Sequence, residues 1–327
     1  MRWTSDTPPP APLTLDVPAA FDGFDEAGYL VCNPDIARDV DPSNPAKWQS
    51  GRQHFQTVGH TEPRLMRRTE GLGAARRAKL PRIKSVLRRW KPHKRRGLKY
   101  DFLTDALRKQ TGIASTERVS SNHYDPSILG LIESCRDGVV LDCGAGRRNI
   151  YFPNIVNYDI VDYDTTDVIG VGEVLPFKSG VFDAVISIAV LEHVRDPFTC
   201  AAELVRVLKP GGRLVACVPF LQPYHGYPHH YYNMTHQGLR ALFDRRLEIE
   251  DQQVPGSLLP IWPLVWIVHS WAAGLPPAER EKFLDVPLRY LLKNPDAYLD
   301  ETWVRELAPE KNLELAGGTV LWARKPK

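Results

Sequence analysis

The feature that most constrains this chain is an apolar run that ends in an acid and two glycines. It reads Val-Val-Leu-Asp-Cys-Gly-Ala-Gly over residues 139–146. A short apolar run bounded by a turn signal predicts a strand that is buried on both faces. The glycines permit the positive φ angles or close packing of a tight turn after the strand. This segment therefore predicts a strand-to-helix turn in an α/β sheet, where ligands bind at the carboxyl ends of strands.

Strand and helix patterns alternate after this turn. We predict a helix over residues 198–208, which ends at a Lys-Pro-Gly-Gly sequence, and a terminal hairpin over residues 313–323, turned at Gly317-Gly318. Apolar runs predict strands over residues 139–142, 155–159, 182–188 and 213–218. Strands that alternate with helical crossovers predict a parallel, doubly wound sheet. Its first crossover helix must be short, because the second of these strands follows closely on the glycine turn.

The position of the acid indicates which ligand the turn holds. Asp142 stands two residues before Gly144, whereas the dinucleotide fingerprint places three glycines against a pyrophosphate. S-adenosylmethionine (SAM) has no phosphate, and its amino-acid head and ribose call for an acid, backbone groups and a close glycine turn. Asp159 ends the next predicted strand, where a carboxylate can accept both ribose hydroxyls. Asp162 and Asp164 are alternative ribose partners.

The motifs that follow the turn come in a recognisable order. They are Gly-Glu-Val-Leu-Pro-Phe at 172–177, Phe-Asp-Ala-Val at 182–185, Val-Leu-Glu-His-Val at 190–194 and Val-Leu-Lys-Pro-Gly-Gly at 207–212. With the glycine turn, this succession resembles the type-11 small-molecule group of class I SAM-dependent methyltransferases from about residue 122 to 243. The resemblance implies a Rossmann-like, mainly parallel seven-stranded sheet with a reversed final hairpin. It also implies SAM as the cofactor.

The glycine turn and the resemblance together predict the cofactor-binding residues. They are Asp142, Cys143, Gly144, Ala145, Gly146, Asp159, Ile160, Gly172, Glu173, Val174, Ala189 and His193. Two positions depart from the family pattern. Arg148 replaces a frequent third glycine, and Val171 stands where an acid for the adenine amino group is common. Adenine recognition must then depend on Glu173 or on nearby backbone groups, and a binding protein that has lost transfer is an alternative.

Residues 219–235 follow the last predicted parallel strand and are rich in histidine and tyrosine. Histidine titrates near neutral pH and can accept a hydroxyl proton, whereas tyrosine can hydrogen-bond to or stack on a sugar. The candidate catalytic residues are His225, His229, His230 and Tyr231. The alternative is a capping loop whose rings only pack. No metal site is predicted, because no carboxylate is evident beside the three histidines.

A basic segment precedes the predicted sheet. Residues 64–100 hold 15 Lys and Arg against a single acid, Glu70, although the net charge of the chain is only +3. Within this segment, Pro81 to Trp90 has the apolar period of an amphipathic helix. Such a helix could lie on an anionic membrane surface. It could also be a solvated linker helix that packs on the enzyme, or part of a nucleic-acid clamp. Nucleic acid is the less favoured partner, since residues 188–191 lack the tetrad of nucleic-acid amino methylases.

Residues 21–66 carry two short helical patterns. The Tyr-Leu-x-x-Asn-Pro-Asp sequence at 29–35 and the His-Phe-x-x-x-Gly-x-x-Glu-x-Arg sequence at 54–64 resemble a small helical module that accompanies bacterial glycan-related enzymes. A generic helical hairpin for packing fits the same residues. The five cysteines show no paired spacing, so we expect reduced thiols. The polar, proline-rich start lacks the apolar stretch of a secretory signal, which favours a cytoplasmic protein, with membrane contact at most peripheral.

These observations predict five regions. They are a disordered lead (1–20), the helical module (21–66), a basic linker with an amphipathic helix (67–100), the methyltransferase core (101–255), and lid helices with a terminal hairpin that complete the core (256–327). The apolar stretch 258–275 predicts a lid helix over the acceptor site, with shallow membrane contact as the alternative. The favoured function is O-methylation of a saccharide, a lipid-linked glycan or a related polar small molecule.

Overall fold

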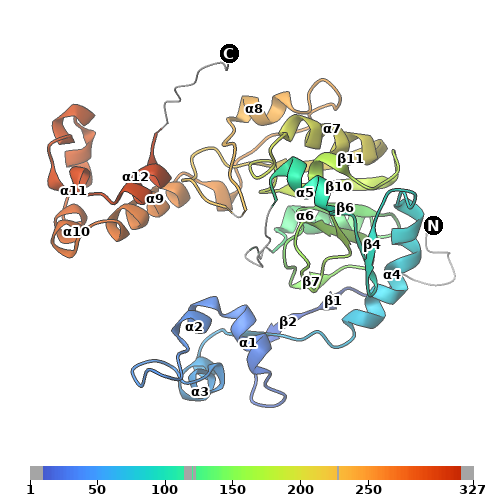
Figure 1. The fold of residues 1–327 in the computed structure, drawn as a ribbon, viewed down its shortest axis with the longest axis horizontal. Coiled ribbons are helices and arrows are strands. Elements are labelled where there is room, and N and C mark those ends of the chain that lie inside the picture. Colours follow the sequence, from blue (N-terminus) through green and yellow to red (C-terminus); the bar gives the residue numbers. More distant parts are fainter. Residues whose placement is uncertain (1–9, 114–119, 121–122, 227, 318–327) are drawn as a thin grey trace. The chain divides into compact units, whose positions relative to one another are not determined.

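The computed structural model describes residues 10–113, 120, 123–226 and 228–317 (Figure 1). Its contacts divide the chain into two compact units. The first, called here the sheet unit, comprises residues 1–191 and 195–217; the second, the helical unit, comprises residues 192–194 and 218–327. The compact unit that holds the sheet thus ends at residue 217, whereas the methyltransferase core was predicted to extend to residue 255.

A seven-stranded sheet forms the centre of the sheet unit, in the order β11-β10-β6-β8-β9-β5-β4. All neighbouring strands are parallel except β4 and β5. The strands are β4 (Lys94–Arg96), β5 (Lys99–Asp101), β6 (Val140–Cys143), β8 (Ile155–Asp159), β9 (Val168–Ile169), β10 (Phe182–Ile188) and β11 (Leu208–Cys217). The predicted α/β class with a mainly parallel sheet is confirmed, as are the four strands read from apolar runs.

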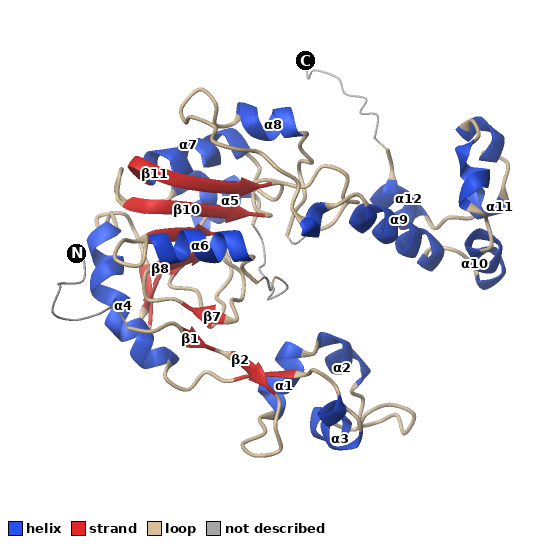
Figure 2. Ribbon diagram, turned by 180° about the vertical axis from the view of Figure 1, so that it is seen from behind, coloured by secondary structure: helices blue, strands red, loops and turns tan. Residues whose placement is uncertain are grey.

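Helices cover both faces of this sheet (Figure 2). On one face, Ile128 and Ile132 of α6 (Pro126–Ser134) pack against Val140 and Ile186. Helix α7 (Pro197–Val207) lies on the other face, where Cys200 meets Cys143, whose side chain points away from that of Val140. Helix α5 (Asp105–Thr111) contributes to a further cluster beside β9. The sheet is therefore doubly wound.

The strand order places a topological switch point between β6 and β10. From β6 the chain proceeds to β8 and β9 on one side, and then returns to β10 on the other. In open α/β sheets, ligands bind outside the carboxyl ends of the strands at such a point. The glycine turn follows β6, and Ala189 follows β10. The predicted cofactor turn thus lies where the topology favours a ligand.

The connection from β6 to β8 contains no helix. Residues 144–154 form turns and the short strand β7 (Ile150–Tyr151), so the predicted crossover helix is wrong. Strand β7 pairs antiparallel with β1 (Leu13–Thr14). A strand from the start of the chain therefore supports the connection that a crossover helix would usually stabilise.

The start of the chain is ordered from residue 13 onward, so the predicted disordered lead is wrong for this part. Besides β1, it forms β2 (Asp16–Pro18), which pairs with β3 (Leu65–Arg67). Leu15, between β1 and β2, is fully buried. Strand pairing on both sides explains how a proline-rich segment without apolar periodicity is held. Residues 1–9 of the predicted lead lie outside the described residues.

The helical patterns at 21–64 form three short helices and one 3-10 turn. They are α1 (Glu26–Cys32), α2 (Pro34–Asp39), α3 (Gly51–Thr57) and η1 (Gly59–Thr61). The residues that carry the module resemblance stabilise this small fold. Tyr29 is buried and its hydroxyl lies 2.9 Å from His54 Nδ1, while Arg64 pairs with Asp35 and Glu62. Packing and ion pairing of these residues explain the sequence pattern at 29–35 and 54–64, so no catalytic role is needed to explain it.

The basic segment is part of the sheet unit and not a linker. Its helix, α4, runs over Leu72–Val86 with Pro81 inside, so the predicted helix at 81–90 is wrong in both limits. Lys79 is fully buried and donates to Ile155 O at 2.5 Å and to Asp167 Oδ2 at 2.6 Å. Arg76 pairs with the same buried carboxylate. These cations attach α4 to the sheet, which the charge count alone could not show.

The antiparallel pair of the sheet lies at an unexpected edge. Strands β4 and β5 form it at the β9 edge, with Gly97 in its turn at φ +57°. The reversed hairpin predicted from the sequence instead lies at residues 313–323. Residues 309–315 form helix α12 (Pro309–Leu315), so the first arm of that hairpin is wrong. The second arm, from residue 318 on, lies outside the described residues.

The helical unit has a core of its own. Buried aromatic and apolar side chains gather from Ala272, Leu275, Phe283, Tyr298 and Trp303. Its elements are α8 (His236–Ala241), η3 (Gly256–Leu258), α9 (Ile261–Ala273), α10 (Pro277–Leu284), η4 (Leu288–Leu292), η5 (Pro295–Tyr298), α11 (Thr302–Arg305) and α12. Helices of the predicted lid region therefore pack on one another. Across the described residues, we find no helix that is both long and apolar enough to span a membrane.

Candidate cofactor and acceptor sites

Asp142, the acid of the glycine turn, is fully buried within a small polar cluster of the sheet unit. Its Oδ2 lies 2.9 Å from Arg148 Nε and 2.8 Å from a second Arg148 nitrogen, and it also accepts from the Tyr124 hydroxyl. The Arg148 guanidinium lies 4.1 Å from the centre of the Tyr124 ring. Arg148, which replaces the third glycine of the family, thus serves as the buried counter-charge of Asp142.

The residues of the turn fit a SAM molecule. Asp142 Oδ1 is buried and has no hydrogen-bond partner among the described residues, so it remains able to accept from the ammonium group of the cofactor. Gly144 has a φ of +78°, and a Cβ there would overlap Val190 Cγ2. The glycine is therefore required where the carboxyl ends of β6 and β10 approach each other.

Asp159 is buried at the carboxyl end of β8. Its Oδ2 accepts from Gly146 N at 2.7 Å, and its Oδ1 accepts from Val161 N at 2.8 Å. Burial raises the pKa of Asp159 to about 6, although the two backbone hydrogen bonds act in the opposite direction. Each carboxylate oxygen retains a further lone pair. Asp159 can therefore hold the glycine turn and still accept a ribose hydroxyl.

The alternative ribose partners are engaged elsewhere. Asp164 pairs with Arg67 at 2.5 Å, and Asp162 pairs with Lys99. These pairs connect the carboxylates to the N-terminal segments of the sheet unit. Among the three acids, the geometry favours Asp159.

The other predicted cofactor residues of the sheet unit follow β6, β8, β9 and β10. Cys143 and Ala145 are buried beside the turn, and Ile160 is partly buried against the cluster around Ile169. Ala189 has a φ of +55°, the only positive φ of a non-glycine residue within the described part of the chain. Such strain is often stored at functional sites, which supports a ligand role for Ala189.

The predicted adenine-binding residues form a single turn, η2 (Gly172–Val174). Val171, which replaces the usual acid, is buried, and its carbonyl accepts from the Tyr158 hydroxyl at 2.8 Å. Burial raises the pKa of Glu173. Glu173 is the acid within this turn, so its contact with adenine stays a prediction, and Val171 contributes to packing.

The described residues of 219–235, called here the acceptor loop, fold around residues 192–194 within the helical unit. Tyr231 N donates to Glu192 O at 2.7 Å, and the His193 Nδ1 hydrogen bond to His229 O is also 2.7 Å long. A Cβ at Gly226 would lie 2.6 Å from His193 Cε1, so only glycine fits this approach. His193, predicted as a cofactor residue, is therefore held by the acceptor loop.

The structure distinguishes among the candidate bases. Both ring nitrogens of His230 are engaged, Nδ1 by His225 N at 3.0 Å and Nε2 by Asn233 at 3.0 Å. His225 Nδ1 donates to Pro223 O at 2.8 Å, which leaves the lone pair on Nε2. The rings of His229 and Tyr231 lie 5.2 Å apart, and Tyr231 is exposed. His230 is thus the least suited of the three histidines to accept a proton.

Glu192, which is not among the predicted site residues, is fully buried beside the acceptor loop. Neither of its carboxylate oxygens has a hydrogen-bond partner among the residues that the structure describes, and burial raises its pKa to about 8. Burial also lowers the pKa of His193 to about 4. Glu192 supplies the carboxylate that seemed absent beside the histidines. The Leu-Glu-His motif at 191–193 was the only sequence feature that marked Glu192. Because about 30 residues separate this motif from His225, the sequence does not show that the two lie close together.

An apolar helix surface accompanies the acceptor loop in the helical unit. Trp266 of α9 packs on His225 with ring centres 5.2 Å apart. Large apolar side chains on the same helix are exposed, namely Ile261, Trp262, Leu264, Val265 and Val268. The loop therefore combines polar, titratable groups with neighbouring apolar surface.

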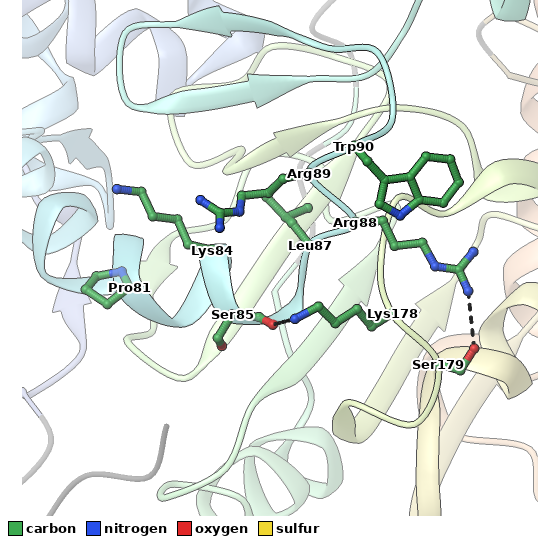
Figure 3. A pocket seen from close by; sticks show the side chains of 9 residues that line it. All are labelled: Pro81, Lys84, Ser85, Leu87, Arg88, Arg89, Trp90, Lys178 and Ser179. Atoms are coloured by element: carbon green, nitrogen blue, oxygen red, sulfur yellow. Dashed lines mark hydrogen bonds between the residues drawn. The ribbon is translucent and has the colours of Figure 1, made fainter.

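A hollow of the sheet unit is lined by residues of α4, of the segment that follows it and of the segment before β10 (Figure 3). It has a volume of about 830 Å³, and its lining includes Lys84, Arg88, Arg89, the exposed Trp90 and Lys178. Lys178 donates to Ser85 O at 2.8 Å and precedes β10 in the chain. The hollow is thus on the amino-terminal side of β10, opposite the edge where the cofactor turn lies. Its cations suit an anionic ligand and not SAM.

Comparison with known proteins assigns the central part of the chain. Residues 143–216 match the Methyltransf_11 family, described as a methyltransferase domain. A demethylmenaquinone methyltransferase of Streptomyces avermitilis is 54% identical over 43 residues, which cover 13% of this chain and 19% of that enzyme. The chain thus aligns with about a fifth of that relative.

Solved structures align with low overlap. The YcgJ protein of Bacillus subtilis is 19% identical, with 53% of this chain and 87% of that chain covered and a TM-score of 0.30. A SAM-dependent methyltransferase of Thermotoga maritima is 21% identical, with 36% and 69% covered and a TM-score of 0.27. The assignment therefore depends on the family match: the chain carries a methyltransferase domain, for which SAM is the expected cofactor.

Proposed function

We propose that this chain transfers the methyl group of SAM to a hydroxyl group of a saccharide, a lipid-linked glycan or a related small molecule. The observation that carries the SAM part is the buried Asp142 with its unpartnered Oδ1, beside a glycine that the fold requires. The methyltransferase domain match spans this turn from Cys143 onward. SAM supplies a methyl group that its sulfonium already activates, so the protein mainly has to orient the two reactants and exclude water.

The proposed acceptor class follows from the acceptor loop. A hydroxyl acceptor has to lose a proton, and His225 and His229 are the candidate groups to receive it. The exposed apolar side chains of α9 would suit a lipid tail, whereas the tyrosines of the loop would suit a sugar. The short match to a demethylmenaquinone methyltransferase makes an isoprenoid quinone precursor the first competing acceptor to test.

Two measurements test this proposal. Calorimetry with SAM should show binding by the full chain, and Asp142→Asn should weaken it. No heat at millimolar SAM would favour a non-catalytic binding protein instead. Labelled SAM should then be incubated with fractionated lipid-linked glycans, soluble glycans and a demethylated quinone. Label in a glycan fraction supports the acceptor class, whereas label in the quinone alone overturns it.

For the basic hollow, we propose contact with an anionic membrane surface. Lys84 and Arg89 remain exposed there beside Trp90, a residue common at bilayer interfaces. Such contact would bring a lipid-linked acceptor to the protein. Binding to vesicles that contain anionic lipid, but not to neutral vesicles, is the expected result, and equal binding to RNA would favour the nucleic-acid alternative.

A further inference from the structure

We propose that Glu192, His193 and His225 form a binding site for a divalent transition-metal ion, with zinc as the best fit. The three residues belong to the helical unit, and each offers one ligand atom. Two imidazoles and one carboxylate are a ligand set that zinc accepts in proteins. The inference goes beyond methyl transfer, because metal binding can be measured without SAM.

The distances are close to those of a metal site. All three ligand atoms lie within 4.8 Å of one another, and His193 Nε2 is 3.7 Å from Glu192 Oε1. In a tetrahedral zinc site with bonds of about 2.1 Å, neighbouring ligand atoms lie about 3.4 Å apart. The longest of these separations would therefore have to shorten by up to about 1.4 Å to complete the site. At 3.7 Å, moreover, the His193 and Glu192 side chains are too far apart to satisfy each other by a direct hydrogen bond.

Backbone hydrogen bonds orient both imidazoles for this role. His193 Nδ1 bonds to His229 O at 2.7 Å, and His225 Nδ1 bonds to Pro223 O at 2.8 Å. A carbonyl can only accept, so each Nδ1 carries the proton and each Nε2 keeps its lone pair. Metal-binding histidines are commonly fixed in this way by the nitrogen that does not face the metal.

Glu192 gives the independent indication that a cation is needed. Its side chain is fully buried, and neither oxygen has a hydrogen-bond partner among the described residues. A buried carboxylate without a partner is costly unless it is protonated or a cation compensates it. A metal ion held by His193 and His225 would provide that compensation.

The site would leave a coordination position for another ligand. Three protein ligands with an open fourth position are typical of zinc sites that bind water or substrate. An acceptor hydroxyl bound there would lose its proton more easily. His225 would then be a metal ligand and not the base, so among the histidines of the acceptor loop His229 would remain the candidate proton acceptor.

The test uses zinc alone and the full-length protein. After dialysis against a chelator, the protein is equilibrated with zinc, and bound metal is measured by calorimetry and elemental analysis. We expect one zinc per chain. Glu192→Gln, His193→Gln and His225→Gln should each weaken binding about tenfold or more. His236→Gln is the matched control, because His236 is exposed at the start of α8, and it should bind as the unaltered chain does.

Two further measurements separate metal binding from loss of folding. Circular dichroism should show that Glu192→Gln retains the helices, since the amide has nearly the same shape as the carboxylate. Glu192→Asp should recover part of the affinity. Cobalt in place of zinc should give the visible absorption of a tetrahedral site. The proposal is overturned if the unaltered chain binds no zinc, or if folded Glu192→Gln binds it as tightly.

Discussion

Asp142 and Glu192 are both fully buried carboxylates, one in the sheet unit and one in the helical unit, but their surroundings differ. Asp142 has the guanidinium of Arg148 and the hydroxyl of Tyr124 on one oxygen, and only its other oxygen is unpartnered. Glu192 has no hydrogen-bond partner on either oxygen among the described residues. The comparison teaches that the cofactor turn carries its own counter-charge, whereas Glu192, beside the acceptor loop, requires a proton or a bound cation.

The largest effect should come from removing the counter-charge of Asp142. Arg148→Met leaves a buried carboxylate without its cation, so we expect a loss of about 3–5 kcal/mol in the free energy of unfolding. Urea denaturation measures it. Asp142→Asn combined with Arg148→Met should recover part of the loss, because the buried charge is gone. Arg147→Met is the control, as Arg147 is only partly buried. Similar losses for both single variants would show that Asp142 does not depend on Arg148.

Asp159 provides an intermediate case, because among the described residues only backbone amides donate to its oxygens. Its pKa of about 6 lies above the unfolded value of about 3.9, so the folded state retains the proton where the unfolded state has lost it. Stability should therefore fall as pH rises from about 4 to about 6, by up to about 2–3 kcal/mol.

Asp159→Asn should remove this part of the pH dependence. Unfolding free energies measured at several pH values between 4 and 7 provide the test. A variant with an unchanged pH profile would indicate that Asp159 is not the group that titrates.

A smaller loss of stability is expected from a change at Gly144, which contacts Val190 where the carboxyl ends of β6 and β10 approach each other. Gly144→Ala places a Cβ against Val190 at a positive φ, which should cost about 1–2 kcal/mol from the backbone alone and weaken SAM binding. Gly130→Ala is a matched control, since Gly130 lies within α6 and a Cβ there meets nothing within 4 Å. It should be neutral or slightly stabilising. Unchanged SAM affinity in Gly144→Ala would place the cofactor elsewhere.

The smallest expected effect concerns the basic segment. In this segment the buried Lys79 pairs with a carboxylate, whereas exposed cations are available to a membrane surface. Lys84→Ala and Arg89→Ala should each reduce binding to anionic vesicles by about 1 kcal/mol, with no change in stability. Lys109→Ala, an exposed change on α5, should leave vesicle binding unchanged. Vesicle sedimentation at low and high salt measures the difference. Equal losses at all three sites would point to net charge and not to the hollow.

Local patterns predicted the parts of the fold that local forces determine. Strands β8 and β10 match their predicted limits, because each is a buried apolar run in a parallel sheet. The predictions failed where distant segments pair. The connection through β7 depends on β1, and the edge pair of β4 and β5 depends on β9. The sequence of β7 does not indicate that it pairs with β1, and the sequence of β5 does not indicate that it pairs with β9.

The sequence by itself determined the α/β class, the succession of the main strands along the chain and the glycine turn with its acid. Apolar period, glycine and the spacing of acids act within a few residues. Only the tertiary structure decided that Arg148 neutralises Asp142, that Lys79 is buried against Asp167, and that Glu192 joins His193 and His225. Burial and electrostatic pairing depend on which segments meet in space. From the sequence alone, these buried charged residues cannot be distinguished from charged residues on the surface.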